Sequence, residues 1–207
     1  MKKFLKISLI IILVVIGVFL IISGISKISK AANEKVSNAF ITQFNKVSNL
    51  AEDIVKTSAL DLSGLAEKEA AKDFSGALSI VQQAMNKNSE TTEKLKNLTS
   101  ETIDFKKLAQ KISDEAAQKS ALAVTIIIEK NNELSAEYLA IQKQILEKAI
   151  AYYQSSQQGA KASLPADFVS LGQKAQQISA ELQKLTPLYA EALKNLVRDA
   201  ELNAVKK

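Results

Sequence analysis

The sequence contains no cysteine, no histidine and no tryptophan. Without cysteine the chain has no disulfides, no thiolate ligands for zinc or iron–sulfur clusters, and no thiol nucleophile. Without histidine it lacks the commonest metal ligand and the usual acid–base group near neutral pH. We therefore expect a protein that is not an enzyme and that has no catalytic, cofactor-binding or metal-binding residues.

Glycine and proline are also scarce, with six and two residues among 207, and aromatic residues make up 5%. The sequence after residue 30 is dominated by Ala, Leu, Lys, Glu, Gln and Ser. This composition is typical of long helices. No glycine-rich phosphate loop and no nucleophile elbow occurs. The composition predicts an all-α protein.

Acidic residues are missing from the first thirty positions, where the basic residues are Lys2, Lys3, Lys6, Lys27 and Lys30. The remaining 22 basic residues are balanced by all 22 acidic ones, so the net charge of +5 belongs to this first segment. No later basic stripe with interleaved aromatic residues is present. We therefore expect no nucleic-acid partner.

An uncharged apolar run of nineteen residues covers positions 7–25. As a helix it would span about 28 Å, close to the thickness of a bilayer core. The run is longer than a typical secretory h-region of about 7–15 residues, and the best cleavage site, Ser29-Lys30-Ala31, lies behind two lysines. These features favour an uncleaved transmembrane signal anchor over a cleaved signal peptide.

The basic stub at residues 1–6 predicts the orientation of this anchor. Because the positive-inside rule keeps such stubs in the cytoplasm, residues 26–207 are expected to be extracytoplasmic. The next most apolar run, Ala121–Ile128, has eight residues and is too short to span a membrane. We predict a single-pass membrane protein whose first partner is the lipid bilayer, through residues 7–25.

After residue 30, apolar residues recur at alternating spacings of three and four, which is the pattern of helices that bury one stripe. This pattern predicts an antiparallel bundle of about four long helices with coiled-coil-like packing, occupying 26–207. The four stripes are Val36, Phe40, Phe44, Val47, Ala51, Ile54 and Leu60; Phe74, Leu78, Val81, Met85, Leu95, Leu98, Phe105, Leu108 and Ile112; Leu134, Tyr138, Ile141, Ile145, Ala149 and Tyr152; and Phe168, Leu171, Ala175, Ile178, Leu182, Leu185, Tyr189, Ala192 and Leu196.

Breaks in the bundle are predicted near 61–64 and 155–165, with one more within 86–114. A helix returning from Gly64 should match the length of the helix before it, which favours a turn near Asn88 or Asn97 over one at Ser113. Pro165 suits the first turn of the last helix. Pro187 interrupts the last stripe without a phase shift, which favours one kinked helix over two.

The remaining polar and apolar features have ordinary structural interpretations beside functional ones. Glu90 and Glu93 share a helix face that is expected to be solvated. The stripe tyrosines Tyr138, Tyr152 and Tyr189 are expected to pack in the core with their hydroxyls reaching the surface. The run Ala121–Ile128 is either the centre of the bundle, which we favour, or an exposed patch for a partner or a membrane.

The outline of one N-terminal anchor and an extracytoplasmic helical bundle resembles that of LemA-type membrane proteins. A local likeness lies in Val36-Ser37-Asn38-Ala39-Phe40, followed by 49–56. The family's aspartate-leucine-isoleucine-proline signature is missing, and the spacing of the two pieces differs. The resemblance implies an architecture and no function.

Three functions fit these observations. The first is a membrane-tethered scaffold or interaction module of the cell envelope, with a protein partner or a second copy bound through the helical stripes. The second is a four-helix ligand-binding or sensory module that works with a signalling partner. The third is a membrane-active helical protein that exposes the run Ala121–Ile128.

Overall fold

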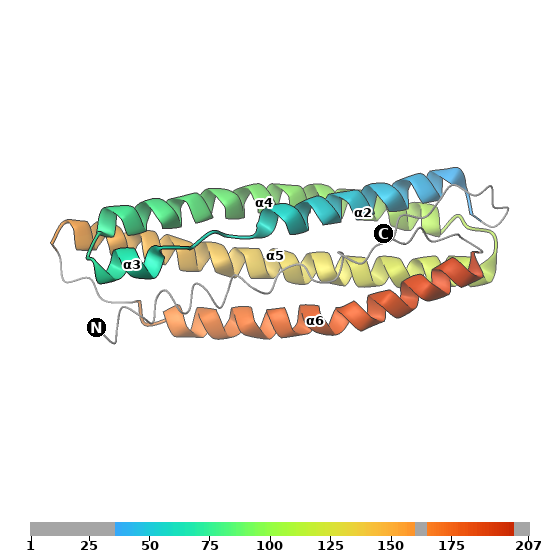
Figure 1. The fold of residues 1–207 in the computed structure, drawn as a ribbon. Coiled ribbons are helices and arrows are strands. Elements are labelled where there is room, and N and C mark those ends of the chain that lie inside the picture. The colour runs from blue at the N-terminus through green and yellow to red at the C-terminus, as the bar shows by residue number, and fades with distance from the viewer. Residues whose placement is uncertain (1–35, 160–164, 201–207) are drawn as a thin grey trace.

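A computed structural model describes residues 36–159 and 165–200, which form helices and connecting turns with no strand among them. The helices are α2 (Asn38–Ser58), α3 (Leu65–Ala70), α4 (Phe74–Ala109), α5 (Glu115–Gln157) and α6 (Phe168–Asp199). Four of them lie antiparallel along one axis, so the described part is an elongated all-α bundle (Figure 1).

Each of the long helices up to α5 begins at a side chain that caps its N-terminus. Ser37 Oγ accepts from the backbone N–H of Phe40 at 3.2 Å, and Asp73 Oδ1 accepts from that of Gly76 at 2.9 Å. Asp114 Oδ1 does the same for α5 at 2.9 Å. Such caps satisfy backbone donors that have no partner within the helix.

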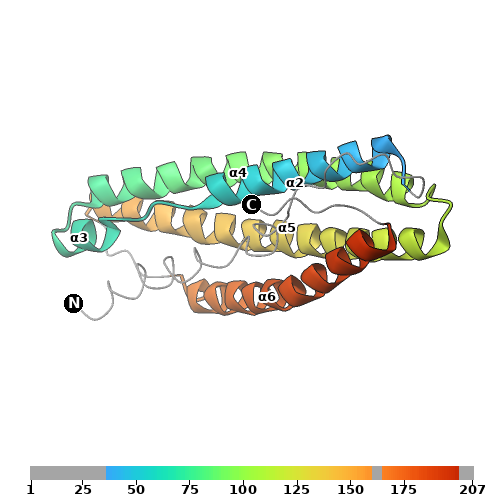
Figure 2. The same ribbon diagram turned by 45° about the vertical axis from the view of Figure 1, so that its right-hand side comes forward.

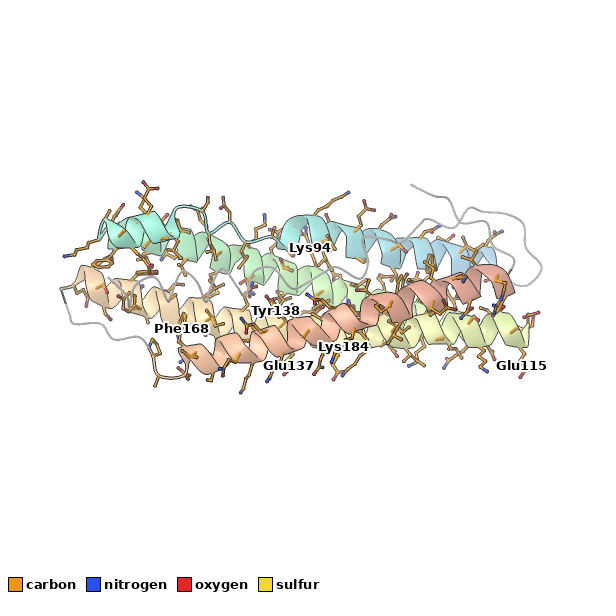
Figure 3. All side chains as sticks on the ribbon, turned by 60° about the horizontal axis from the view of Figure 1, so that its bottom comes forward. Lys94, Glu115, Glu137, Tyr138, Phe168 and Lys184 are labelled. Atoms are coloured by element: carbon orange, nitrogen blue, oxygen red, sulfur yellow. The ribbon has the colours of Figure 1, made fainter. Side chains whose placement is uncertain are left out.

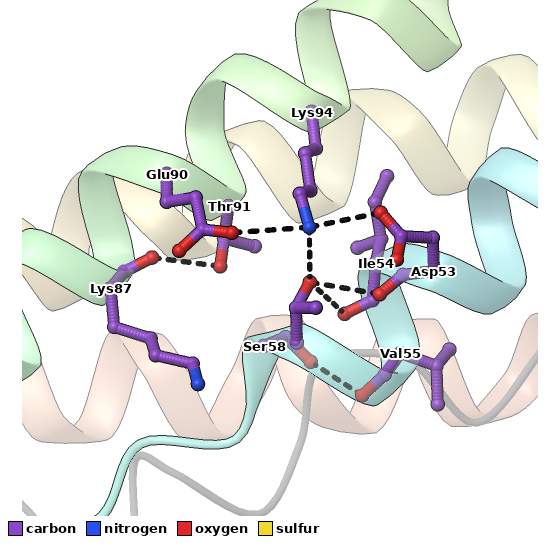
Figure 4. A network of polar contacts seen from close by, with 9 residues as sticks. Asp53, Ile54, Val55, Ser58, Lys87, Glu90, Thr91 and Lys94 are labelled. Atoms are coloured by element: carbon purple, nitrogen blue, oxygen red, sulfur yellow. Dashed lines mark hydrogen bonds and ion pairs between the residues drawn. The ribbon is translucent and has the colours of Figure 1, made fainter.

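Helix α2 packs on α4 through aromatic rings. The ring of Phe105 lies 5.0 Å from that of Phe40 and 5.6 Å from that of Phe44, and all three side chains are fully buried. At the other end of α2, Lys94 Nζ lies 2.9 Å from Asp53 and 3.1 Å from Glu90 (Figure 4). Its hydrogen bond with Asp53 raises the pKa of Lys94, but exposed ion pairs of this kind contribute little to stability.

Helices α4 and α5 form the longest seam, and polar side chains are buried within it. Asn88 Nδ2 donates to Leu139 O at 3.1 Å and to Gln142 Oε1 at 2.8 Å. Nearer the turn, Asn132 Nδ2 donates to Thr102 Oγ1 at 3.2 Å. These paired groups fix one register of α4 against α5, because a shift along the axis would leave them without partners.

Helix α6 is the outermost helix of the row and comes close to α5 alone among the described helices. It continues through Pro187 without a break, as predicted, and bends along its second half (Figure 2). Proline removes one backbone donor and crowds the preceding turn, which explains the bend.

Almost all of the stripe residues are buried or pack against the core, which confirms the predicted stripes. Figure 3 places Tyr138 between the helices, while Glu137 and Lys184 point away from them. The hydrophobic periodicity therefore identified the inner face of each long helix.

The turn between the second and third long helices lies within the predicted interval 86–114, but at neither of the favoured positions, Asn88 and Asn97. Helix α4 runs without interruption through Asn88 and Asn97, and the chain reverses at residues 110–114, next to Ser113. Residues 59–62 are not helical, and an extended residue advances about twice as far as a helical one, so the distance back from Gly64 is longer than α2. The returning helix is correspondingly longer than α2.

The start of the last helix also differs from the prediction. Pro165 precedes α6 instead of occupying its first turn, and its carbonyl accepts from the N–H of Phe168 at 3.1 Å. Asp167 is the N-cap residue but makes no capping hydrogen bond, and its carboxylate pairs with Lys148 Nζ at 3.0 Å.

The predicted stub and anchor, residues 1–6 and 7–25, lie outside the described residues. Within the described part, no helix combines the length and the apolar character needed to cross a membrane.

We predict that Phe105→Ala lowers the free energy of unfolding by about 3–5 kcal/mol, because the two facing rings are left with a cavity. Urea denaturation followed by circular dichroism measures this change. Ile103→Ala, on the same helix and 49% exposed, is the matched control and should change the value by less than about 0.5 kcal/mol. Equal losses in the two variants would contradict the packing of α2 on α4.

Candidate functional site

The candidate site is a groove between α5 and α6, close to the end of the bundle at which α2 begins. It encloses a cavity of about 310 Å³. The lining residues are Ala116, Lys119, Ser120 and Ala123 from α5, and Ala192, Asn195, Arg198 and Asp199 from α6. Small alanines on both helices form its apolar lining, and the polar groups converge from its two walls.

The polar wall is organised by the carboxylate of Asp199. Ser120 Oγ donates to Asp199 Oδ2 at 2.5 Å, and Arg198 Nε donates to Asp199 Oδ1 at 2.8 Å. This hydrogen bond with Asp199 raises the pKa of Arg198 above its ordinary value. The contacts hold the only arginine of the chain beside the groove.

The groove presents two cations, one carboxylate and one amide. Lys119 and the guanidinium of Arg198 supply positive charge, and Asn195 adds an amide. The Ser120 hydroxyl donates its hydrogen bond to the carboxylate of Asp199. Asp199 offsets one of these two positive charges, so the groove keeps the charge of Lys119 and suits a small polar molecule with an apolar part.

A second group of polar side chains lies inside the bundle, at mid-length of α5. Asn131 is 1% exposed, and neither its amide nitrogen nor its amide oxygen has a hydrogen-bond partner among the described residues. The same holds for the hydroxyls of Ser135 and Tyr189. A buried polar group without a partner costs about 1–3 kcal/mol.

At the opposite end of the bundle, a buried carboxylate joins the short helix α3 to the end of α5. Glu69 is 3% exposed and accepts a hydrogen bond from the hydroxyl of Tyr153, which is fully buried. Burial, followed by the contact with Glu69, raises the pKa of Tyr153. The pair fixes α3 against α5.

The tyrosine prediction needs a correction. Tyr138 and Tyr189 lie in the core as predicted, but their hydroxyl oxygens are buried and do not reach the surface. Because α6 covers α5 along most of its length, the centre of the bundle is too far from water for a tyrosine side chain to span. Tyr153, which lies on none of the predicted stripes, donates a hydrogen bond to the buried carboxylate of Glu69.

The other features singled out in the sequence lie where their structural interpretation places them. In the run Ala121–Ile128, most side chains are buried or half-buried, and Ile126 alone among them is strongly exposed, at 59%. Glu90 and Glu93 are exposed and pair with Lys94 and Lys96.

No metal site emerges from the part of the chain that the structure describes, since no three carboxylates gather closely enough to hold an ion. In comparisons with known proteins, no protein-family model, no curated protein and no solved structure matches the chain. Its class is therefore defined by its architecture, an elongated all-α bundle with a groove between its last two helices.

Sequence reasoning missed the residues that build these sites. Asn131 stands seven residues from both Val124 and Tyr138 and so belongs to the same helix face. That spacing was a usable signal. No sequence pattern indicated the pairing of Ser120 with Asp199, because the two residues are 79 positions apart.

We predict that Tyr189→Phe protects the protein from alkaline unfolding. Complete burial raises the pKa of Tyr189, so the folded protein keeps a proton that the unfolded chain releases above about pH 10. The stability is therefore complete below that pH and falls as the pH rises, by up to about 1.4 kcal/mol per pH unit for this group. Because phenylalanine has no hydroxyl to titrate, the Tyr189→Phe variant does not lose this part of its unfolding free energy at high pH.

Urea denaturation of the two proteins between pH 7 and pH 11 tests this prediction. The difference in unfolding free energy should be constant up to about pH 9 and grow by about 1 kcal/mol between pH 10 and 11. A difference that stays constant up to pH 11 would show that Tyr189 titrates in contact with water.

Proposed function

We propose that the chain is a membrane-tethered, extracytoplasmic helical rod that presents its far end to a protein partner in the cell envelope. The observation that carries this proposal is the layout of the bundle. One end of the bundle, which we call the proximal end, contains the start of α2, the turn between α4 and α5, and the end of α6. The opposite end, with α3 and the end of α5, is the distal end.

The proximal end is close in sequence to the predicted transmembrane anchor. Ten residues, 26–35, separate the anchor from Val36, and they can span at most about 35 Å. Helix α5 alone has 43 residues and is about 64 Å long. A bundle tethered at its proximal end can thus hold the distal end some 60 Å away from the bilayer.

The burial of the stripes supports a role as a spacer more than self-association through them. Their residues already pack against one another within one chain, so a second copy could use them only if the bundle opened. The strongly exposed large apolar residues of the described part are isolated ones, Ile103, Ile126, Val169 and Leu188. Isolated residues of this kind are normal on a protein surface.

We predict that the bundle lies outside the cytoplasm, and the lack of cysteine makes the test simple. Lys72→Cys at the distal end should react with a membrane-impermeant maleimide in intact cells, and Lys3→Cys should react only after lysis. Because each variant carries a single thiol, the labelled position is unambiguous. Equal labelling of Lys3→Cys and Lys72→Cys in intact cells would contradict the predicted topology.

We also predict that the partner is bound at the distal end. A photo-crosslinking residue placed at Lys72 in the full-length chain should yield one reproducible protein adduct in cells. The same residue at Lys184, on the outer side of α6, is the matched control and should yield none. Adducts at Lys184 alone would place the binding surface on the side of the rod, and no adduct at either position would contradict the proposal.

The groove at Asp199 favours a second candidate function, a ligand-binding module that works with a partner. The charge of Lys119 and the amide of Asn195 suit a small polar molecule such as an anion, and the apolar lining suits a short hydrocarbon part. A thermal-shift screen with inorganic phosphate and aliphatic dicarboxylates tests this function. Stabilisation that is lost in both Lys119→Ala and Arg198→Ala would support it, and no shift with any of these anions would count against it.

A further inference from the structure

The buried face of α5 contains a seam with a seven-residue repeat. Its members are Val124, Asn131, Tyr138, Ile145 and Tyr152, none of them more than 9% exposed. In coiled coils, one polar residue in such a seam specifies the arrangement of the helices and lowers the stability of the assembly. Asn131 occupies this position here.

The amides of Asn88 and Asn131 differ in how well they are satisfied. Asn88, between α4 and α5, makes two hydrogen bonds across the seam. Asn131 and the α6 hydroxyl of Tyr189 have no hydrogen-bond partner in the described part of the chain. Separating α4 from α5 would break the contacts of Asn88, whereas separating α6 from α5 would let water reach the hydroxyl of Tyr189, because α6 packs on α5 alone among the described helices.

Pro187 of α6 lies at the same level as Asn131. Ser120 contacts Asp199, and the two helices are antiparallel, so the residue opposite Asn131 lies eleven positions before Asp199, next to Pro187. Pro187 leaves the carbonyl of Gln183 without its usual helical donor and bends the helix. The unsatisfied layer and the break in helical hydrogen bonding therefore coincide.

The polar contacts that hold α6 on α5 lie near its ends. Lys148 Nζ binds Asp167 at 3.0 Å at the distal end, and Ser120 binds Asp199 at 2.5 Å at the proximal end. Among the described helices, α6 approaches only α5, whereas α4 packs on α2, α3 and α5. Helix α6 can therefore leave without disturbing the other pairs.

We propose that α6 is a gate that opens from α5 as a unit while α2, α4 and α5 stay folded, and that the layer of Asn131, Pro187 and Tyr189 sets how often it opens. Opening exposes the apolar stripe of α6 and the facing side of α5, which the closed bundle hides. The gate is a property of the fold and does not depend on the proposed function.

Native-state hydrogen exchange on the full-length chain, followed by mass spectrometry, tests the gate. Amides of α6 on both sides of Pro187 should exchange at least ten times faster than those in the middle of α4, and they should do so as one cooperative group. Exchange of α4, α5 and α6 at one common rate would overturn the proposal, because the bundle would then open only by global unfolding.

Substitutions in the polar layer separate the gate from ordinary helix fraying. Asn131→Leu removes the unsatisfied amide and should slow exchange in α6 about tenfold relative to α4. Thr125→Val is the matched control, since Thr125 is a buried residue of α5 whose hydroxyl already donates to Ala121 O, and it should give no such slowing in α6. If Asn131→Leu does not fold, Tyr189→Phe makes the same test with a smaller change. Unchanged relative exchange of α6 in the folded variants would contradict the role of the layer.

An engineered disulfide gives an independent test. The double variant Ser120→Cys/Asp199→Cys joins two side chains that are in contact, in a chain with no other cysteine. The oxidised form should bring the exchange of α6 down to the rate of α5, and a reducing agent should restore fast exchange. Fast exchange in the oxidised form would show that α6 unwinds locally and does not open as a unit.

Discussion

The side-chain amide of Asn88 lies between the two longest helices, where its two hydrogen bonds admit one register of α4 against α5. Every other element takes its position from this pair. Helix α2 packs its phenylalanines on α4, α3 lies against α4 and the end of α5, and α6 rests on α5. A loss of register in the α4–α5 seam would therefore misplace all the remaining contacts.

Most of the core could be predicted from the sequence, because a helix with one buried face imposes a spacing that is visible in the text. The stripe residues of α6, from Phe168 to Leu196, show this best. The reversal of the chain at 110–114 was harder to predict. It depends on how far the non-helical residues 59–62 advance, and on Asn88 being buried in a helix and not exposed in a turn. Both depend on tertiary packing, whereas local residue preferences favoured a turn at the asparagines.

The candidate sites were less accessible to sequence reasoning than the core. Nothing in the Ala- and Lys-rich sequence distinguishes the residues of these sites. Only folding brings Ser120 to Asp199 and Glu69 to Tyr153. Asn131 is different, since its place in a seven-residue repeat could have identified it as a core residue. The repeat could not show that its amide would lack partners, because that depends on which side chains the facing helices supply at the same level.

The contact between Glu69 and Tyr153 also limits the order in which the protein can fold. The two residues are 84 positions apart, so at synthesis rates of about 5–20 residues per second Glu69 waits roughly 4–17 s for its partner. During that time α2 and α4 can already pair, since Phe40 and Phe105 emerge earlier. The distal end therefore closes late, and α6, which follows Tyr153 in the chain, docks last onto helices that are already assembled.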